Sequence, residues 1–428
     1  MQLIKYPARE QWAELLKRPS LDVASLYDQV KITLDEVREQ GDTALRNFTL
    51  KFDKVDVKVP EVTKEEIAEG VKTVSVELKQ AIEMARRNIW KFHSEQQREY
   101  TEIQTSPGVY CWQKAVPIEK VGLYVPGGSA PLFSTVLMLG IPAQIAECKE
   151  VILCTPPGMD GKIHPAVLYA AQVAGIHRIF KAGGAQAIAA MAYGTESIPK
   201  VYKIFGPGNQ YVTAAKQLVS LTDTAIDMPA GPSEVEIIAD ETASAVYVAS
   251  DLLSQAEHGA DSQAMLVTTS ENLMDEVLRQ IEIQIEKLPR KETARKALEN
   301  SKIILVKSLD EAIAITNEYA PEHLIISTRS YMVVAEHIVN AGSVFLGNMS
   351  PESAGDYASG TNHTLPTHGF AKAYSGVNLD SYLKKITFQQ LTPDGLTNLS
   401  NAIILMAENE GLQAHANAVK VRTEKPEL

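Results

Sequence analysis

The chain is poor in cysteine: only Cys111, Cys148 and Cys154 occur among its 428 residues. An odd and sparse set argues against a disulfide framework and favours a reducing compartment. We assign no nucleophilic role to any of the three. The amino terminus also lacks the long apolar core of a signal peptide, so a cytoplasmic protein is expected.

Positive charge is scarce as well, because the formal net charge is -12 and no basic run stands out. Nonspecific nucleic-acid binding needs lysines and arginines that displace counterions, so no nucleic-acid partner is expected. The longest apolar stretch, residues 130–146, is interrupted by proline, glycine and polar residues. A membrane span needs about 20 mostly apolar residues, so we expect a buried helix there and no membrane partner.

The length predicts two or three packed units, because one hydrophobic core rarely serves so long a chain. Residues 1–119 are predicted to be mainly helical, with apolar residues at helical spacing from Thr63 to Gln97. Residues 120–232 and 233–370 each alternate β-branched runs with helix-like stretches, which is typical of βαβ units with a parallel sheet. Residues 371–428 read as a helical tail that must pack on this subunit or on a partner.

The expected strands and helices follow from this alternation. In the first half the strands are Val121–Val125, Val151–Cys154, Arg178–Lys181 and Val201–Phe205, with helices near Val136–Ile145, Ala166–Ala174 and Ala187–Ala192. In the second half the strands are Val235–Ala239, Ala264–Thr268, Ile303–Val306, Leu324–Ser327 and Ser343–Leu346, with helices near Ser244–Ala256, Leu273–Lys287 and Leu309–Tyr319.

Three glycine turns, at 126–131, 183–186 and 206–211, each follow an expected strand. The backbone N–H groups of the helices that they open could offset the charge of a pyrophosphate. The third turn departs from the dinucleotide fingerprint, because Tyr211 stands where the last glycine belongs. The turns therefore indicate either a nucleotide site or tight turns alone.

Gln255 and His258 lie three residues apart at the end of a predicted helix that Gly259 terminates. Residues at this spacing are neighbours, with Cβ atoms roughly 5–6 Å apart. An amide oxygen and an imidazole nitrogen could therefore reach one metal ion. The alternative is a solvated helix end whose histidine complements the helix dipole.

Two other segments carry polar groups suited to chemistry. Glu322 and His323 precede an apolar run and offer two proton acceptors of different basicity, as general acid–base catalysis requires; an exposed loop pair is the alternative. The small-residue loop 351–363 is too poor in apolar groups to be core, which favours a functional site. It carries Asp356, Tyr357 and His363.

A metal site could be assembled from distant parts of the chain. Gln255, His258, Asp356 and His415 together would give oxygen and nitrogen ligands, which suit zinc or manganese better than calcium. Their spacing does not establish that they converge. No His-Glu-x-x-His or Cys-x-x-Cys motif is present.

Taken together, the motifs resemble those of the histidinol dehydrogenase family. The resemblance rests on residues 121–128, 183–187, 206–209, 231–234, 255–263, 320–323, 353–363 and 410–415, in this order. It implies an α/β fold of two incomplete Rossmann-like halves with parallel sheets. The first half, 120–232, would bind NAD and the second, 233–370, would hold the metal and the catalytic groups. The helical segment 1–119 would pack on the second half.

The resemblance also implies roles for individual residues. Gln255, His258, Asp356 and His415 would hold one zinc ion per subunit, and Tyr124, Gln186 and Asn209 would line the NAD site. Glu322 and His323 would be catalytic. Substrate contacts are implied for Ser233, Gln255, His258, Glu322, His323, Asp356, Tyr357, His363, Glu410 and His415.

The implied reaction is oxidation of L-histidinol to L-histidine in two NAD-dependent hydride transfers through histidinaldehyde, the last step of histidine biosynthesis. His323 would act as base in both transfers, and Glu322 would activate water between them. The family also implies a homodimer with shared active sites, in which the 371–428 tail reaches the partner. A zinc hydrolase and a non-catalytic metal-binding scaffold are the competing hypotheses, and His368 receives no role.

Overall fold

The computed structural model describes residues 1–18, 24–127, 131–229 and 231–423. By contact the chain divides into two units, one of Met1–Glu95 with Ile118–Tyr382 and one of Gln96–Pro117 with Leu383–Leu428. Each unit is described by itself. The glycine turn predicted at 126–131 includes residues 128–130, and the 231–234 motif follows residue 230; these four residues lie outside the described part of the chain.

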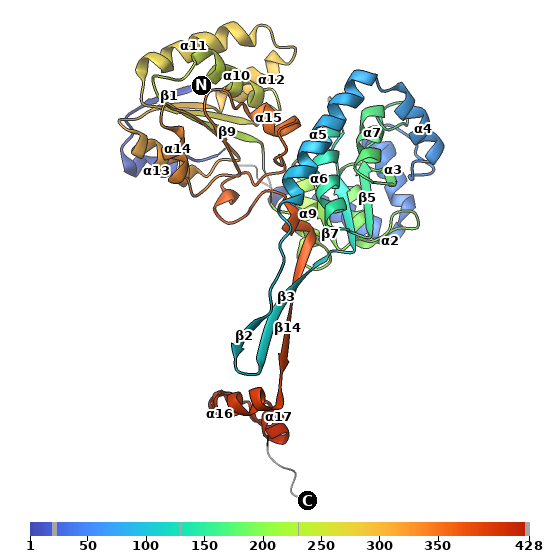
Figure 1. Cartoon of the computed structure of the whole chain (residues 1–428). Helices are drawn as coiled ribbons and strands as arrows, with labels where there is room; N and C mark the ends of the chain where they lie inside the picture. The colour runs from blue at the N-terminus through green and yellow to red at the C-terminus, as the bar shows by residue number, and fades with distance from the viewer. Residues whose placement is uncertain (19–23, 128–130, 230, 424–428) are drawn as a thin grey trace, which may run out of the picture. The chain divides into compact units, whose positions relative to one another are not determined.

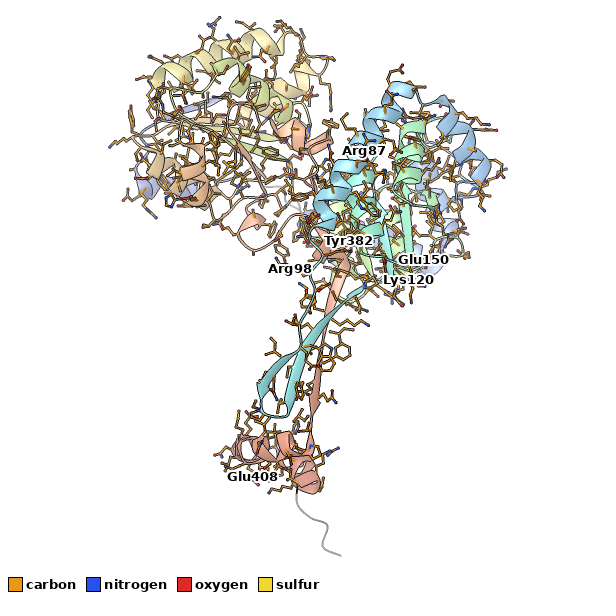
Figure 2. All side chains as sticks on the ribbon, viewed as in Figure 1. Arg87, Arg98, Lys120, Glu150, Tyr382 and Glu408 are labelled. Carbon is orange, nitrogen blue, oxygen red and sulfur yellow. The ribbon has the colours of Figure 1, made fainter. Side chains whose placement is uncertain are left out.

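The first half contains a five-stranded parallel sheet with the strand order β6-β5-β4-β7-β8. In chain order this is 3-2-1-4-5, the strand order of the dinucleotide-binding Rossmann fold without its sixth strand. The four predicted strands are confirmed. An ion pair of 3.5 Å joins Lys120, the first residue of β4, to Glu150, the first residue of β5 (Figure 2). The strands are β4 (Lys120–Tyr124), β5 (Glu150–Thr155), β6 (Arg178–Lys181), β7 (Lys203–Phe205) and β8 (Ala225–Ile226).

Helices cover both faces of this sheet (Figure 1). They are α6 (Phe133–Ile145), α7 (Pro165–Val173), α8 (Gly184–Tyr193) and α9 (Gln210–Ser220). Nearly every residue of α6 is buried, which confirms the buried helix expected from the longest apolar stretch. Among the described residues, no helix is long and apolar enough to cross a membrane.

The second half contains a six-stranded parallel sheet with the order β1-β11-β10-β9-β12-β13. Its last five strands repeat the 3-2-1-4-5 order, and β1 (Gln2–Lys5) is added at the edge. Apolar residues of α10–α12 pack on one face and those of α13 and α14 on the other (Figure 1). The other strands are β9 (Glu234–Ala239), β10 (Gln263–Thr268), β11 (Lys302–Leu305), β12 (His323–Ser327) and β13 (Ser343–Leu346). The helices are α10 (Ala245–Ala256), α11 (Glu271–Ile285), α12 (Lys291–Glu299), α13 (Leu309–Tyr319) and α14 (Tyr331–Glu336).

The amino-terminal helices pack on the first half, which differs from the expected packing on the second. Helix α2 contacts α8 and α9, and α3 contacts α8. Helix α4 contacts α7, and α5 contacts α6 and α7. Helices α2 and α3 pack there because their apolar side chains, among them Val30, Leu34 and Leu45, are buried in the hydrophobic core of the first sheet. Among the described amino-terminal elements, β1 and α1 (Trp12–Leu15) join the second sheet. The bounds of the four helices are α2 (Ala24–Gln40), α3 (Asp42–Phe52), α4 (Lys64–Thr73) and α5 (Val76–Ser94).

The second unit is an antiparallel sheet of β14, β3 and β2 followed by two helices. Two of its features were not expected: residues 1–119, which are otherwise mainly helical, contribute a hairpin, and the 371–428 tail contributes a strand before its two helices. Residues 371–382 belong to the first unit, where Tyr382 stacks on Phe205 at 4.2 Å between ring centres. The elements are β2 (Ile103–Ser106), β3 (Val109–Pro117), β14 (Leu383–Leu391), α16 (Pro393–Asn409) and α17 (Gln413–Thr423).

Contacts inside the second unit hold these elements together. Trp112 stacks on Phe388 at 5.4 Å across β3 and β14. Glu408, labelled in Figure 2, accepts a hydrogen bond from Lys420 at 2.7 Å and so joins α16 to α17. The middle of β14 exposes side chains on both faces, including those of the apolar residues Ile386 and Phe388.

Candidate functional site

A cavity of about 1180 Å³ lies at the carboxyl ends of β4–β7 in the first half. The loops that follow these strands line it, together with residues of α2 and α4. Tyr124, Gln186 and Asn209, the three residues predicted to contact NAD, all line this cavity. In open α/β sheets, ligands bind at this edge, where the strand order reverses.

Gly206, directly after β7, allows the backbone there to approach the end of β4 closely. Gly206 has φ 126°, and a Cβ there would overlap the carbonyl oxygen of Tyr124. Asp227 accepts a hydrogen bond from the Gly206 N–H at 2.8 Å, and Lys216 donates to the Gly206 carbonyl at 2.8 Å. Lys216 and Asp227 form a buried ion pair, so the 206–208 turn is held from both sides.

Two helix amino termini reach the same cavity. The Asn209 side chain accepts hydrogen bonds from Tyr211 and Val212 at 3.1 Å each, and so caps α9. The Tyr124 hydroxyl accepts from the Gly184 N–H at 3.0 Å, at the start of α8. Helix amino termini carry partial positive charge and favour phosphate groups. The nucleotide interpretation of the glycine turns is therefore favoured over tight turns alone.

One acidic group in the cavity has no hydrogen-bond partner among the described residues. The Oδ2 atom of Asp53 is buried and unpaired, Asp53 lines the cavity, and burial raises its pKa. A sugar hydroxyl is a donor that would satisfy this oxygen. Asp53 follows α3, outside the βαβ units, so no fingerprint spacing could have identified it.

The predicted catalytic pair lies in the second half, at the amino-terminal ends of β9 and β12. Glu322 Oε2 accepts a hydrogen bond from the Glu234 N–H at 2.8 Å. His323 Nδ1 lies 3.1 Å from the Glu234 carbonyl oxygen, so Nδ1 carries the hydrogen of the neutral ring. His323 Nε2 is buried and makes no hydrogen bond, so it is the ring atom that can accept a proton when the ring is neutral. Both residues are buried, which excludes the exposed loop pair.

Three carboxylates surround the His323 ring. Nδ1 lies 3.6 Å from Glu322 and 3.7 Å from Glu352, and Nε2 lies 3.6 Å from Asp356. Burial alone would lower the pKa of His323, but Glu352, Glu322 and Asp356 together hold it well above its usual value. Burial raises the pKa of Glu322 to about 7 and that of Glu352 to about 8. Groups that titrate near neutrality suit general acid–base catalysis.

Three of these side chains could hold a metal ion. One ligand atom each of His323, Glu352 and Asp356 lies within 4.8 Å of the others. Only Asp356 belongs to the predicted ligand set. Glu352 begins α15 (Glu352–Tyr357) and is buried; it lies in the loop singled out from the sequence, but its carboxylate was not considered.

Gln255 gives an independent indication of a ligand. It lies on α10 and is fully buried, and neither Oε1 nor Nε2 has a hydrogen-bond partner. Buried polar atoms are rarely left unpaired, because each costs about 1–3 kcal/mol. His258, two residues past the end of α10, interacts electrostatically with Asp356 and His323. Oxygen and imidazole donors in this arrangement fit a zinc or manganese ion.

The remaining predicted residues are placed as follows. His363 is engaged through both ring nitrogens, with the Asp356 carbonyl at 2.9 Å and the Thr135 hydroxyl at 3.1 Å. Tyr357 is exposed, and Ser233 directly precedes β9. Glu410 and His415 belong to the second unit, where both are exposed. The structure thus brings together His258, Glu322, His323, Asp356 and His363.

A parallel α/β fold with a large cavity at its strand ends and a buried cluster of carboxylates and histidines is typical of enzymes. The family model for histidinol dehydrogenase matches residues 16–423. The chain therefore belongs to the histidinol dehydrogenase family.

Individual relatives cover nearly the whole chain. A histidinol dehydrogenase of Bacteroides thetaiotaomicron is 65% identical over 422 residues, covering 99% of both chains. One of Shigella dysenteriae is 52% identical over 416 residues, covering 96% of this chain and 95% of the relative. The crystal structure of histidinol dehydrogenase from Elizabethkingia anophelis has a TM-score of 0.97 and 55% identity, covering 99% of this chain and 98% of that one.

Proposed function

We propose that this protein oxidises L-histidinol to L-histidine through histidinaldehyde, consuming two NAD and one water, as the last step of histidine biosynthesis. Membership of the family supports the reaction. Within the chain, the observation that carries it is the buried pair Glu322 and His323, with Nε2 of His323 left free. The first-half cavity, with its helix amino termini and the unpaired Asp53 oxygen, supports the use of NAD.

His323 and Glu322 would divide the proton chemistry. Nε2 of His323 takes the hydroxyl proton of histidinol as the hydride leaves the carbinol carbon for NAD. Glu322 then removes a proton from water, the water oxygen adds to the aldehyde carbon, and the carbonyl oxygen takes up a proton from solvent, which gives the hydrate. His323 takes a hydroxyl proton of this hydrate as the second hydride leaves, which yields the carboxylic acid. Each group must return its proton to solvent before it acts again.

We propose that Gln255, His258, Asp356 and His415 hold one zinc ion per subunit. The ion would orient the substrate through its imidazole and amino nitrogens. The unpaired Gln255 amide supports this set. We do not assign His323 as a metal ligand. Its Nδ1 is hydrogen-bonded to the Glu234 carbonyl oxygen, and a metal ion on Nε2 would prevent that atom from acting as the base. Ser233, Tyr357, His363 and Glu410 are proposed substrate contacts.

We also infer a cytoplasmic homodimer in which the tail that carries Glu410 and His415 completes the partner's site. Both side chains are exposed within their own unit, which suits contact with another surface. All three cysteines are unpaired, as a reducing compartment would keep them.

The test is histidinol-dependent formation of NADH by the purified protein, measured by absorbance. Chelation should abolish NADH formation, and added zinc should restore it. A zinc hydrolase would bind the metal without forming NADH, and a metal-binding scaffold would turn over no alcohol. Full activity in protein shown to be free of metal would contradict the zinc assignment and leave the dehydrogenase assignment standing.

A further inference from the structure

Arg18, a residue outside the second sheet, links the start of β9 to the start of β12, where the catalytic pair lies. Arg18 lies in the amino-terminal segment after α1. Its guanidinium group donates to both carboxylate oxygens of Glu234, with Nη2 2.8 Å from Oε2. The two side chains expose only 11% and 3% of their surface. A bidentate ion pair that is largely closed to water has a well-defined geometry.

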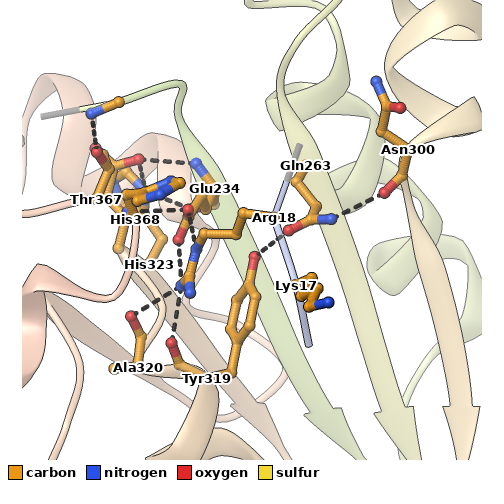
Figure 3. Close-up of polar contacts among 12 residues, drawn as sticks. Lys17, Arg18, Glu234, Gln263, Asn300, Tyr319, Ala320, His323, Thr367 and His368 are labelled. Atoms are coloured by element: carbon orange, nitrogen blue, oxygen red, sulfur yellow. Dashed lines mark hydrogen bonds and ion pairs between the residues drawn. The ribbon is translucent and has the colours of Figure 1, made fainter. Parts of the chain in front are cut away.

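The same guanidinium group reaches the turn that precedes β12 (Figure 3). Nη2 donates to the carbonyl oxygens of Tyr319 at 2.8 Å and Ala320 at 3.3 Å, and the group lies 3.9 Å from the centre of the Tyr319 ring. Ala320 has φ 55°, in the left-handed region that residues with a side chain rarely adopt. Such a conformation persists where surrounding contacts hold it, and Arg18 supplies one of these contacts.

Glu234 transmits this restraint to the catalytic pair through its backbone. Its N–H donates to Glu322 at 2.8 Å, and its carbonyl oxygen lies 3.1 Å from His323 Nδ1. A displacement of this backbone would therefore move a partner of each catalytic group at once. The Glu234 carboxylate also accepts from the backbone N–H of His368 at 3.0 Å, which gives residue 368 a role through its backbone.

We propose that Arg18 is a positioning residue of the catalytic pair. Arg18 holds Glu234 and the Ala320 turn together. It thereby keeps His323 Nδ1 hydrogen-bonded to the Glu234 carbonyl oxygen, so that Nε2 is the ring nitrogen that can act as the base. The guanidinium suits this role, because its planar fork of five donors can serve a carboxylate and two carbonyl groups together, which a lysine ammonium group cannot do with the same geometry. The inference rests on the proposed function, because the consequence of losing Arg18 is measured in histidinol oxidation.

The first experiment compares Arg18→Met and Arg18→Lys with Arg178→Met. Arg178 is the control: it also joins the amino-terminal segment to a strand start, through Glu61 and Glu150, but neither of these partners is bonded to a catalytic residue. Arg18→Met should lower kcat by about 100-fold, the effect of a roughly 1 Å misplacement. KM for histidinol and NAD should stay within about threefold. Arg18→Lys should recover part of kcat, and Arg178→Met should retain it. Equal losses in Arg18→Met and Arg178→Met would overturn the proposal.

A double variant separates positioning from charge compensation. Arg18→Met alone leaves the Glu234 carboxylate buried and without its cation, which destabilises the fold. Adding Glu234→Gln removes that charge, so the midpoint of thermal unfolding should return toward the wild-type value. The two strand starts remain unlinked, so kcat should stay low. Recovery of kcat together with stability would contradict a positioning role.

A third readout does not depend on activity. In protein labelled with ¹⁵N-histidine, the Nδ1–H of His323 should give a slowly exchanging NMR signal, assigned by its loss in His323→Asn. Arg18→Met should shift or broaden this signal, whereas Arg178→Met should not. An unchanged signal in Arg18→Met would overturn the proposal. A changed signal in a protein whose wild type does not oxidise histidinol would instead refute the proposed function and support the positioning role.

Discussion

Replacing Gln255 by methionine should stabilise the metal-free protein and lower the affinity of the protein for zinc. Gln255 is fully buried, and both polar atoms of its amide lack a partner. Natural proteins rarely keep such a group unless a ligand uses it. Methionine has a similar length and volume and carries no group that needs a hydrogen bond, so the substitution removes the unpaired atoms with little repacking.

The expected magnitude follows from two opposing contributions. Each unpaired buried polar atom costs about 1–3 kcal/mol, so their removal should return roughly 2–6 kcal/mol. A volume-conserving substitution in a packed interior costs less than about 1.5 kcal/mol. The net gain in the metal-free protein should be about 2 kcal/mol, which raises the unfolding midpoint by about 3 °C for a unit of this length, at roughly 2.1 cal/mol/K of unfolding entropy per residue. Loss of a ligand should weaken zinc binding by at least about 100-fold.

The assay is thermal unfolding of chelator-treated protein, with zinc affinity measured by competition with a chromophoric chelator. Gln263→Met is the matched control, because Gln263 is also a buried glutamine but both ends of its amide are satisfied. Its Nε2 donates to the Asn300 carbonyl at 2.9 Å, and its Oε1 accepts from the Tyr319 hydroxyl at 2.6 Å. This variant should lose stability and keep its zinc affinity. Destabilisation of metal-free Gln255→Met, or unchanged zinc affinity in it, would refute the reasoning.

Two further predictions concern protons. His323→Asn should lower kcat by about 10²–10⁴-fold without loss of zinc. Glu322→Gln should slow the oxidation of added histidinaldehyde more than that of histidinol. Turnover within about threefold of wild type in both variants would show that neither residue acts in proton transfer. Burial raises the pKa of Glu236 to about 8 from its ordinary 4.5, so the folded state keeps a proton that the unfolded state releases between these values. The free energy of unfolding should therefore fall as pH rises from about 4.5 to 8, by at most about 1.4 kcal/mol per pH unit. Glu236→Gln should flatten this decline, and identical pH profiles for wild type and variant would contradict the buried neutral carboxyl.

The two sheets were predictable because their strands are short β-branched runs set between helices. The β14 strand was not predicted, because its polar–apolar alternation is confined to residues 385–389 and the middle of Leu383–Leu391 is exposed on both faces. The packing of α2 and α3 on the first half also escaped prediction, because amphipathic spacing shows which face of a helix is buried and not what covers it.

Some residues of the site could be predicted from the sequence and others could not. Helical spacing made Gln255 and His258 neighbours, and adjacency in the chain paired Glu322 with His323. Arg18 and Asp53 had no such signal, because each reaches its site from a different part of the chain and is recognised only by its contacts. Glu352 lay in the loop that the sequence singled out, but its burial against His323 is a property of the folded chain.

The number of NADH molecules formed per histidinol tests the central claim most directly. With limiting L-histidinol and excess NAD, the absorbance should plateau at two NADH per histidinol, with L-histidine as the product. A plateau at one NADH, with histidinaldehyde released, would contradict an account in which Glu322 hydrates the aldehyde and His323 serves both oxidations.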